Sequence, residues 1–239
     1  MDAPLISCIM ATRGNAFPAR YAIQCYQRQT HPRRELVIVC RNEGREVRDL
    51  VAGLADPTIR FFSIPYAESV GELRNAAMRH AQGDLFAIWD DDDLSHPERL
   101  ALQQAGIAAT GATASFLSRV ALWWPARGRI AESGWRTWEN TMLVRRSAIP
   151  AYSSLTRGSD TELVRSLRAT APLALIDRPD GYYYVCHGGN LWGADHFEML
   201  FRGARRCYEG AMYGNILASP APTVPLADYA RELGSGLIS

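Results

Sequence analysis

The sequence contains no lysine, and all 26 of its basic residues are arginine. A lysine amine forms the Schiff base in pyridoxal-phosphate enzymes and in related carbonyl chemistry. Lysine also contacts the transferred phosphates in Walker-type NTPases and in protein kinases. The sequence therefore excludes these classes. Any phosphate must be bound by arginine, by backbone amides or by a metal ion.

Other features are also scarce. The five cysteines are odd in number and form no C-x-x-C pair, which predicts reduced thiols in a cytoplasmic protein. A net charge of +1 gives no strong field for nucleic acid or anionic lipid. No apolar run approaches the roughly 20 residues of a membrane-spanning helix. The first residues include an acid and no basic segment, so no signal peptide is expected. A peripheral position at the inner membrane face stays open.

With 239 residues, the chain is long enough for one large α/β domain or two small ones. Apolar runs that resemble strands alternate with segments of helical spacing through the first hundred residues. We predict strands at 5–10, 35–40, 59–64 and 85–89, and helices at 18–29, 46–54 and 71–80. This alternation is typical of a doubly wound, mostly parallel sheet with helices on both faces. Such sheets bind ligands beyond the carboxyl ends of their strands.

The alternation weakens after residue 100. We predict helices at 100–109, 161–169 and 196–208, and strands at 114–124, 142–144, 174–177 and 182–185. The proline-rich segment 219–225 cannot form a helix or a central strand, so we expect residues 216–239 to be a loose tail.

Four consecutive carboxylates, Asp90 to Asp93, directly follow the apolar run at 85–89. Two carboxylates about 4 Å apart repel each other by roughly 1 kcal/mol in water and roughly 4 kcal/mol near a protein surface. Ser95 and Glu98 match a capping box at the start of the next helix. The partial positive charge of a helix start stabilises a nearby acid by roughly 0.3–1 kcal/mol, which is enough for one or two acids but not for four.

The aspartate run therefore predicts a cation site. Oxygen ligands favour Mg²⁺, Mn²⁺ or Ca²⁺ over zinc. An EF-hand loop is excluded because the required glycine and the closing glutamate are missing.

The segment that begins at Asp90, D-D-D-D-L-S-H-P, resembles the D-x-D-D-x-x-x-P signature of family 2 glycosyltransferases, whose fold is called GT-A. Further segments resemble landmarks of that family in the expected order, at 4–13, 29–32, 35–39, 71–77, 158–163 and 184–192. The resemblance implies a Rossmann-like mixed sheet in a single domain spanning 1–215, with a donor-binding half at about 1–100 and an acceptor-side half at about 101–215.

The resemblance also implies roles for individual residues. It assigns Asp90 and Asp92 to the sugar nucleotide and its metal ion, Mn²⁺ or Mg²⁺. Asp91 and Asp93 are interpreted as a more structural pair, of which Asp91 is kept as a donor-binding candidate. The other candidates for donor binding are Thr12, Arg13 and Arg74.

Two further residues stand at positions that the family uses for chemistry. His187 matches a position that completes the metal or diphosphate shell in several relatives, and the alternative is a histidine that fixes a loop. Asp160 matches the catalytic base, which takes the proton of the acceptor hydroxyl in an inverting transfer. The alternative for Asp160 is an N-cap of the helix expected from Thr161.

The sequence departs from the family pattern at two positions. Cys40 stands where the family usually has the aspartate that reads the nucleobase, although Asn42 or Glu43 could substitute. Ser159 replaces the glutamate that usually precedes the catalytic aspartate, here Asp160. A UDP-type sugar donor is favoured, although the identity of the nucleobase stays open. The expected acceptor is a glycan or another hydroxyl compound. No nucleic-acid partner is expected.

Two other functions remain open. A nucleotidyltransferase usually carries a glycine-rich loop with a lysine after the first strand, and here the turn at 11–15 has one glycine and no lysine. A non-catalytic sugar-nucleotide-binding relative is favoured by the changes at Cys40 and Ser159 but opposed by the intact aspartate run. Trp135, Trp138 and Trp192 could stack on sugar rings, although a core position is the commoner place for tryptophan.

Overall fold

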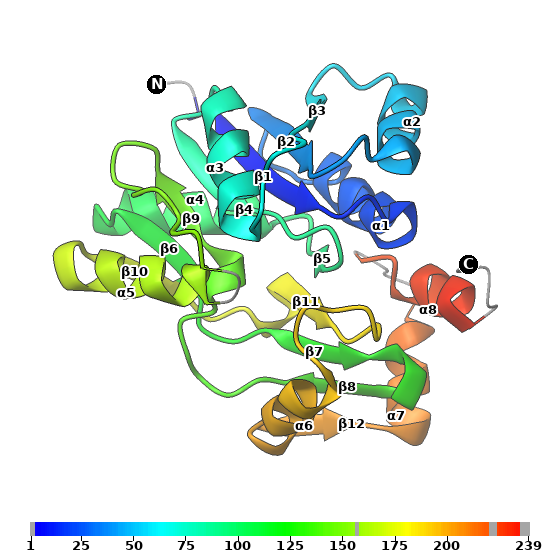
Figure 1. The fold of residues 1–239 in the computed structure, drawn as a ribbon. Helices are drawn as coiled ribbons and strands as arrows, with labels where there is room; N and C mark the ends of the chain where they lie inside the picture. The colour runs from blue at the N-terminus through cyan, green and yellow to red at the C-terminus, as the bar shows by residue number, and fades with distance from the viewer. Residues whose placement is uncertain (1–2, 156–157, 220–223, 235–239) are drawn as a thin grey trace.

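The computed structural model describes residues 3–155, 158–219 and 224–234, which form two β-sheets and the helices that cover them (Figure 1). The larger sheet has seven strands in the order β10-β6-β9-β4-β1-β2-β3. Their bounds are β1 (Ile6–Thr12), β2 (Arg34–Cys40), β3 (Ile59–Ser63), β4 (Leu85–Ile88), β6 (Ala114–Leu117), β9 (Leu143–Arg145) and β10 (Leu173–Ile176). Only β9 runs antiparallel to its neighbours, β4 and β6. The predicted α/β fold with a mixed, mostly parallel sheet is confirmed.

Helices cover both faces of this sheet. They are α1 (Ala16–Gln27), α2 (Arg45–Leu54), α3 (Val70–His80), α4 (Arg99–Thr110) and α5 (Ser159–Thr170). Successive residues of a strand point to opposite faces. Cys8 and Met10 accordingly join the core cluster that contains α1 and α4, while Ile9 joins the cluster that contains α3 and α5. Burial on both faces explains why these strands are continuous apolar runs in the sequence.

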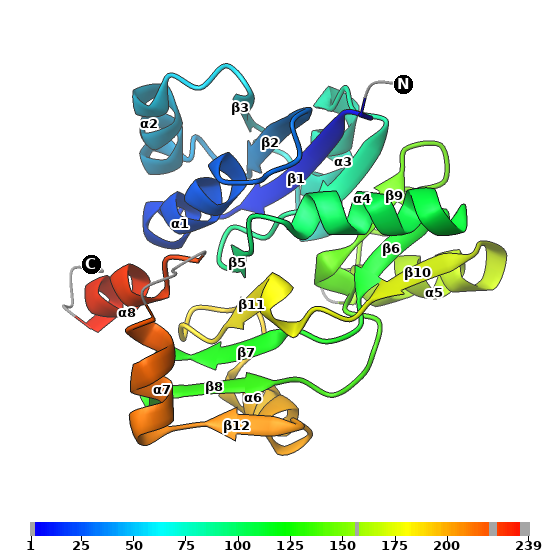
Figure 2. The same cartoon turned by 180° about the vertical axis from the view of Figure 1, so that it is seen from behind.

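The second sheet has five short strands in the order β12-β8-β7-β11-β5 and forms the lower half of the molecule in Figures 1 and 2. Its elements are β5 (Leu94–Ser95), β7 (Ala121–Trp124), β8 (Arg129–Glu132), β11 (Tyr182–Val185), β12 (Arg206–Tyr208), α6 (Ala194–Arg202) and α7 (Gly210–Leu217), with 3-10 turns at Pro125–Arg127, Glu139–Thr141 and Pro179–Gly181. The predicted helix at 196–208 is wrong after Arg202, because the chain turns at Gly203 and then pairs with β8 as β12.

The aspartate run connects the two sheets. β4 of the larger sheet ends at Ile88, and β5 of the smaller sheet begins at Leu94. The five residues between them are Trp89 and Asp90 to Asp93. The four carboxylates therefore lie at the junction of the two sheets, at the carboxyl end of a central strand.

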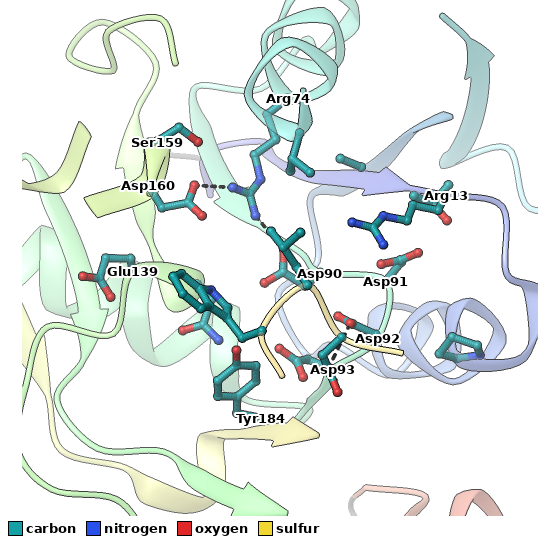
Figure 3. Close-up of a pocket in the computed structure, with 18 of the residues that line it drawn as sticks. Arg13, Arg74, Asp90, Asp91, Asp92, Asp93, Glu139, Ser159, Asp160 and Tyr184 are labelled. Carbon is teal, nitrogen blue, oxygen red and sulfur yellow. Dashed lines mark hydrogen bonds and ion pairs between the residues drawn. The ribbon is translucent and has the colours of Figure 1, made fainter. Parts of the chain in front are cut away.

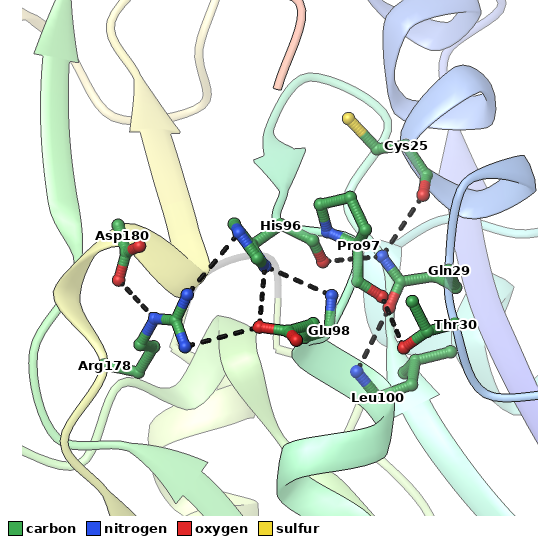
Figure 4. A network of polar contacts seen from close by, with 9 residues as sticks. All are labelled: Cys25, Gln29, Thr30, His96, Pro97, Glu98, Leu100, Arg178 and Asp180. Carbon is green, nitrogen blue, oxygen red and sulfur yellow. Dashed lines mark hydrogen bonds and ion pairs between the residues drawn. The ribbon is translucent and has the colours of Figure 1, made fainter. Parts of the chain in front are cut away.

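The predicted capping box at Ser95 is wrong. Ser95 lies in β5, and α4 begins only at Arg99. The chain between them is held by Gln29, whose side chain donates to the His96 carbonyl at 2.7 Å and accepts from the Leu100 amide at 3.1 Å (Figure 4). A side chain from another part of the chain thus caps the helix. The structure has a complete capping box at the start of α3, where Ser69 and Glu72 exchange hydrogen bonds.

The predicted loose tail is wrong for residues 226–234, which form α8 (Leu226–Gly234). Tyr229 of this helix is fully buried, and its ring packs against those of Phe17, Tyr21 and Trp123 at centroid distances of 5.0–5.2 Å. The proline-rich positions 220–223 and the last residues, 235–239, lie outside the described residues.

Glu35 is a buried carboxylate at the start of β2. It accepts hydrogen bonds from Ser7 Oγ at 2.6 Å, the Gln82 amide at 2.6 Å and Arg60 Nη2 at 2.5 Å. Burial alone would raise the pKa of Glu35, but these three donors lower it below its usual value. A carboxylate with a lowered folded-state pKa stabilises the fold above the unfolded-state pKa, and this contribution is lost as the pH falls through the folded-state pKa.

We expect Glu35→Gln to lower the free energy of unfolding at pH 7 by about 2 kcal/mol, because hydrogen bonds to a charged group become weaker ones. The difference from the wild type should shrink below pH 4. Denaturant unfolding at both pH values measures it, with the exposed Glu43→Gln as the control. Equal losses for both variants would contradict the role of the buried network.

Candidate functional site

A cavity of about 420 Å³ lies where the two sheets meet, and all eight predicted site residues line it. They are Thr12, Arg13, Arg74, Asp90, Asp91, Asp92, Asp160 and His187. The turn after β1, the start of α3 and the β4–β5 connection form one part of its wall. The start of α5 and the segments at 136–140 and 184–196 form the rest (Figure 3).

The turn after β1 contributes Thr12 and Arg13. Thr12 is buried, and its hydroxyl accepts from the Gly14 amide at 3.0 Å and contacts the Asp91 carboxylate. Arg13 is exposed and lies on the Asp91 side of the run (Figure 3). A backbone turn and a guanidinium at the carboxyl end of a parallel strand form a suitable place for an anionic ligand.

Arg74 of α3 joins the two parts of the cavity wall. Its Nη2 contacts Asp90 Oδ1 at 2.8 Å, and its Nη1 pairs with Asp160 (Figure 3). The side chain of Arg74 is only 6% exposed. Burial alone would lower its pKa, but the charges of Asp160 and Asp90 raise it well above the usual value. One buried cation therefore bridges the aspartate run and the first turn of α5.

Asp160 does not cap α5. That helix begins at Ser159 with Gly158 as its N-cap, so Asp160 is the second helical residue. The alternative prediction for Asp160 is therefore wrong. Ser159, at the position where the family has glutamate, is buried and also lines the cavity.

Asp92 meets His187 directly. Asp92 Oδ2 lies 3.0 Å from His187 Nε2 and 3.4 Å from Asn190 Nδ2. Asn190 also holds the loop, because its Oδ1 accepts from the His187 amide and its Nδ2 donates to the Val185 carbonyl. Asn190 thus fixes the loop that carries His187, and the His187 imidazole faces a carboxylate.

The pair formed by Asp92 and His187 fits a cation that is shared with a ligand. In the described part of the chain, no three His, Cys, Asp or Glu side chains gather as a complete cage. Mg²⁺ usually takes only one or two carboxylates from the protein and completes its shell with phosphate oxygens and water. Asp92 and His187 could therefore supply part of the coordination shell of a divalent ion.

Asp93 has a structural role. Its carboxylate accepts from Tyr182 Oη at 2.5 Å and from the Val185 amide at 2.8 Å, which ties the run to β11. The interpretation of Asp93 as structural agrees with these contacts. Asp91 and Asp93 both line the cavity, and Asp91 lies beside Thr12.

The structure also shows how the charges of the run are tolerated. Burial and the neighbouring carboxylates raise the pKa of Asp91 and Asp93. Arg74 lowers the pKa of Asp90, but burial has the larger effect and the pKa of Asp90 is raised. A cation bound beside the run would lower these pKa values, because an opposite charge favours the ionised carboxylate.

Arg99 is a buried residue near the run that sequence reasoning missed. Its guanidinium donates to the Ile88 carbonyl and stacks on the rings of Trp89 and Tyr182.

Of the three tryptophans considered for sugar stacking, Trp138 and Trp192 line the cavity and Trp135 does not. Other lining residues carry no motif that sequence reasoning could have used: Arg136 and Glu139 come from the segment before β9, and His196 comes from the first turn of α6. Arg136 Nη2 contacts Glu139 Oε2 at 2.5 Å. Tyr184 and Asn190 do lie in a segment that resembles a family landmark, but sequence reasoning assigned them no role.

Cys40 is buried at the end of β2 and does not line the cavity. Its Sγ lies beneath two glycines: a Cβ at Gly44 would come within 2.6 Å of this sulfur, and one at Gly14 within 3.6 Å. Glu43, a proposed substitute, is exposed and contacts Arg45. Neither Asn42 nor Glu43 is among the lining residues.

Residues 7–143, more than half of the chain, match the sequence profile described as Glycosyl transferase family 2. A curated relative is the putative colanic acid biosynthesis glycosyl transferase WcaA of Escherichia coli (strain K12). It is 33% identical over 101 residues, which are 41% of this chain and 36% of that protein. The match thus spans about a third of the relative's length.

Solved structures resemble the whole arrangement. S. aureus TarS 1–349 in complex with UDP has a TM-score of 0.64 at 14% identity, covering 92% of this chain and 73% of that one. The mannosyltransferase PcManGT from Pyrobaculum calidifontis, in complex with GDP-Man and Mn²⁺, has a TM-score of 0.63 at 16% identity, covering 99% and 71%. At these identities the likeness shows the fold alone, and that fold is GT-A. In the described ranges, no helix has the length and apolar character needed to cross a bilayer.

Proposed function

This chain belongs to glycosyl transferase family 2, and from this membership we propose that it moves a sugar from a nucleoside diphosphate to a hydroxyl acceptor, with inversion and with a divalent cation. The observation that carries the proposal is the Asp90–Arg74–Asp160 bridge beside the Asp92–His187 pair, all within one cavity. This arrangement places carboxylates, the buried guanidinium of Arg74 and a candidate catalytic base at the carboxyl ends of the strands.

In this proposal Thr12, Arg13, Arg74, Asp90 and Asp91 bind the donor. Arginine suits a diphosphate because its planar guanidinium donates two parallel hydrogen bonds, and the chain has no lysine for this purpose. The likeness to proteins solved with UDP and with GDP-Man supports a nucleotide donor. A UDP-type donor is our working choice. Because Cys40 is buried, other groups must recognise the nucleobase of the donor.

Asp92 and His187 would hold the metal ion, Mn²⁺ or Mg²⁺. When bound, such an ion neutralises the diphosphate and makes it a better leaving group. The protein holds the side chains of Asp92 and His187 in position for this ion. Asn190 does this by contacting Asp92 and by holding the loop that carries His187.

Asp160 acts as the base. The acceptor oxygen bonds to the anomeric carbon while the bond from that carbon to the diphosphate oxygen breaks, and the diphosphate leaves with the bonding electrons. The hydroxyl proton passes to the Asp160 carboxylate. A single displacement of this kind inverts the configuration at the anomeric carbon. Arg74 keeps Asp160 at the cavity and links it to Asp90.

A binding protein without turnover is the second candidate, and the position of Cys40 favours it. The acid that reads the base in relatives is replaced here by a buried thiol. The two candidates differ in turnover, whereas both require donor binding.

Thermal shift with a panel of sugar nucleotides tests donor binding, each with Mn²⁺ and with EDTA. We expect one sugar nucleotide to raise Tm only when the metal is present, because a ligand that binds the native state stabilises it. Nucleoside triphosphates serve as the control. Stabilisation by a triphosphate alone, or equal stabilisation in EDTA, would contradict the proposal.

A further inference from the structure

Four aromatic side chains, Trp138, Tyr184, Trp192 and His196, line the part of the cavity formed by segments 136–140 and 184–196. We propose that this aromatic shelf binds the acceptor, and that the acceptor is a saccharide whose ring lies on Trp192 and His196. The inference rests on the proposed function, since it names the class of acceptor for the same cavity.

Trp192 and His196 form a platform. Their rings are stacked, with centroids 4.9 Å apart and planes inclined by 24°. Trp192 is 41% exposed, so part of its surface is open to a ligand. Burial and the charge of Arg136 lower the pKa of His196, so its imidazole is neutral at pH 7. A neutral stacked pair offers an apolar surface of the kind that the C–H face of a sugar ring covers.

Trp138 supplies a hydrogen-bond donor. Trp138 as a whole is 3% exposed, and among the described residues its buried Nε1 has no hydrogen-bond partner. A buried indole N–H usually has a partner, because leaving it unpaired costs free energy. Trp138 lines the cavity, so an oxygen of a bound ligand can accept this bond.

Arg136 and Glu139 complete the polar side of the shelf. The Arg136 guanidinium lies 4.6 Å from the centre of the Trp138 ring and contacts the Glu139 carboxylate. A guanidinium donates and a carboxylate accepts, so together they can satisfy neighbouring hydroxyl groups. Sites for polar rings combine aromatic surface with a few placed polar groups in this way. An acyl chain would leave the Trp138 N–H and this ion pair without ligand partners.

The shelf lies in the same cavity as Asp160, the proposed base. Thr12, Arg13 and Asp91 belong to other segments, which follow β1 and β4. The polar groups of the shelf, at 136–140, therefore lie on a different segment from those proposed for the diphosphate, whereas Trp192 and His196 share the segment 184–196 with the proposed metal ligand His187. We assign the shelf to the acceptor sugar because its polar groups are separate from the donor residues.

Saturation-transfer NMR on the full chain tests the proposal, with UDP and Mg²⁺ present and with GDP as a parallel arm. The probes are the methyl glycosides of glucose, galactose, mannose and N-acetylglucosamine, with glycerol as a control that has hydroxyls but no ring. We expect saturation of a glycoside on one ring face and none of glycerol. Trp192→Ala should lower the glycoside signal by about fivefold or more. Trp138→Phe, which keeps a ring but removes the N–H, should also weaken it.

The nucleotide signal shows in each sample that the variant is folded, and Leu175→Ala at an exposed position of β10 is the matched control. An absence of glycoside saturation in a sample where the nucleotide binds would overturn the inference. So would an unchanged signal in Trp192→Ala, or displacement of the glycoside by an intact sugar nucleotide. An absence of nucleotide binding would instead contradict the proposed function.

Discussion

Asp160→Asn is expected to lower the rate of glycosyl transfer by about 10³-fold, because general base catalysis typically contributes factors of this order. The asparagine cannot accept the acceptor proton, but its amide oxygen can still accept a hydrogen bond from Arg74. Arg74 also keeps its 2.8 Å contact with Asp90. Donor binding should therefore change little. Release of nucleoside diphosphate under saturating donor measures the rate, and calorimetry measures donor affinity.

Glu162→Gln is the matched control for this experiment, because it makes the same kind of change at an exposed position in the same helical turn. It should leave the rate unchanged. If Asp160→Asn turned over as fast as the wild type, Asp160 would not be the base. If it lost donor binding together with turnover, the ion pair with Arg74 would be its main contribution.

Asp92→Asn is expected to abolish the effect of divalent cations on both binding and turnover. Asp92 is the carboxylate that meets His187, and stabilisation of the leaving group by a metal ion is worth several kcal/mol. We expect turnover to fall by about 10³-fold or more, and the Tm with donor and Mn²⁺ to match the Tm with donor and EDTA.

Asp180→Asn, at a half-exposed position that contacts Arg178, is the control for the loss of a carboxylate. It should keep the full response to Mn²⁺. If Asp92→Asn kept the wild-type response of Tm and turnover to Mn²⁺, other aspartates of the run would be the ligands of the cation. A loss of folding in Asp92→Asn is not expected, because Asp93, and not Asp92, binds Tyr182 and the Val185 amide.

The larger sheet could be predicted because its strands are buried on both faces. Burial of Ile6 to Met10 and of Leu36 to Val39 favours apolar residues along each run, with the hydrogen-bonded Ser7 as the exception, and such runs are visible in the sequence. The smaller sheet could not be predicted in the same way. Its strands have two to four residues, and their pairing joins distant segments, as when Tyr182 pairs with Ser95.

The two capping sites show how far local patterns can be used. Ser69 and Glu72 form a capping box because the chain there is extended before it enters α3. Ser95 and Glu98 have the same spacing, but Ser95 is paired in β5, and Gln29 from another segment binds the start of α4. A contact between distant segments thus overrides the local signal. α8 was missed for a similar reason, since Tyr229 is held by rings from α1 and β7.

For the candidate site, the eight residues that were assigned from recognisable motifs all line one cavity, whereas the proposed substitutes Asn42 and Glu43 do not. Their roles stay predictions. Arg136 and Glu139 were not assigned to the site, because their segment has no landmark and only the fold brings it to the cavity. Arg99 was missed because a buried arginine has no distinctive sequence context. Its partners are a backbone carbonyl, the side chains of Ser95 and Gln103, and aromatic rings.

The most direct test of a metal-dependent, inverting transferase is proton NMR of the first sugar product. The wild-type chain is mixed with the sugar nucleotide that binds best, with Mg²⁺ or with EDTA, and the anomeric proton is followed before mutarotation while water serves as acceptor. We predict release of the nucleoside diphosphate only with Mg²⁺, and a free sugar that first appears as the anomer opposite to that of the donor. First appearance of the donor's own anomer, or equal release in EDTA, would contradict this mechanism.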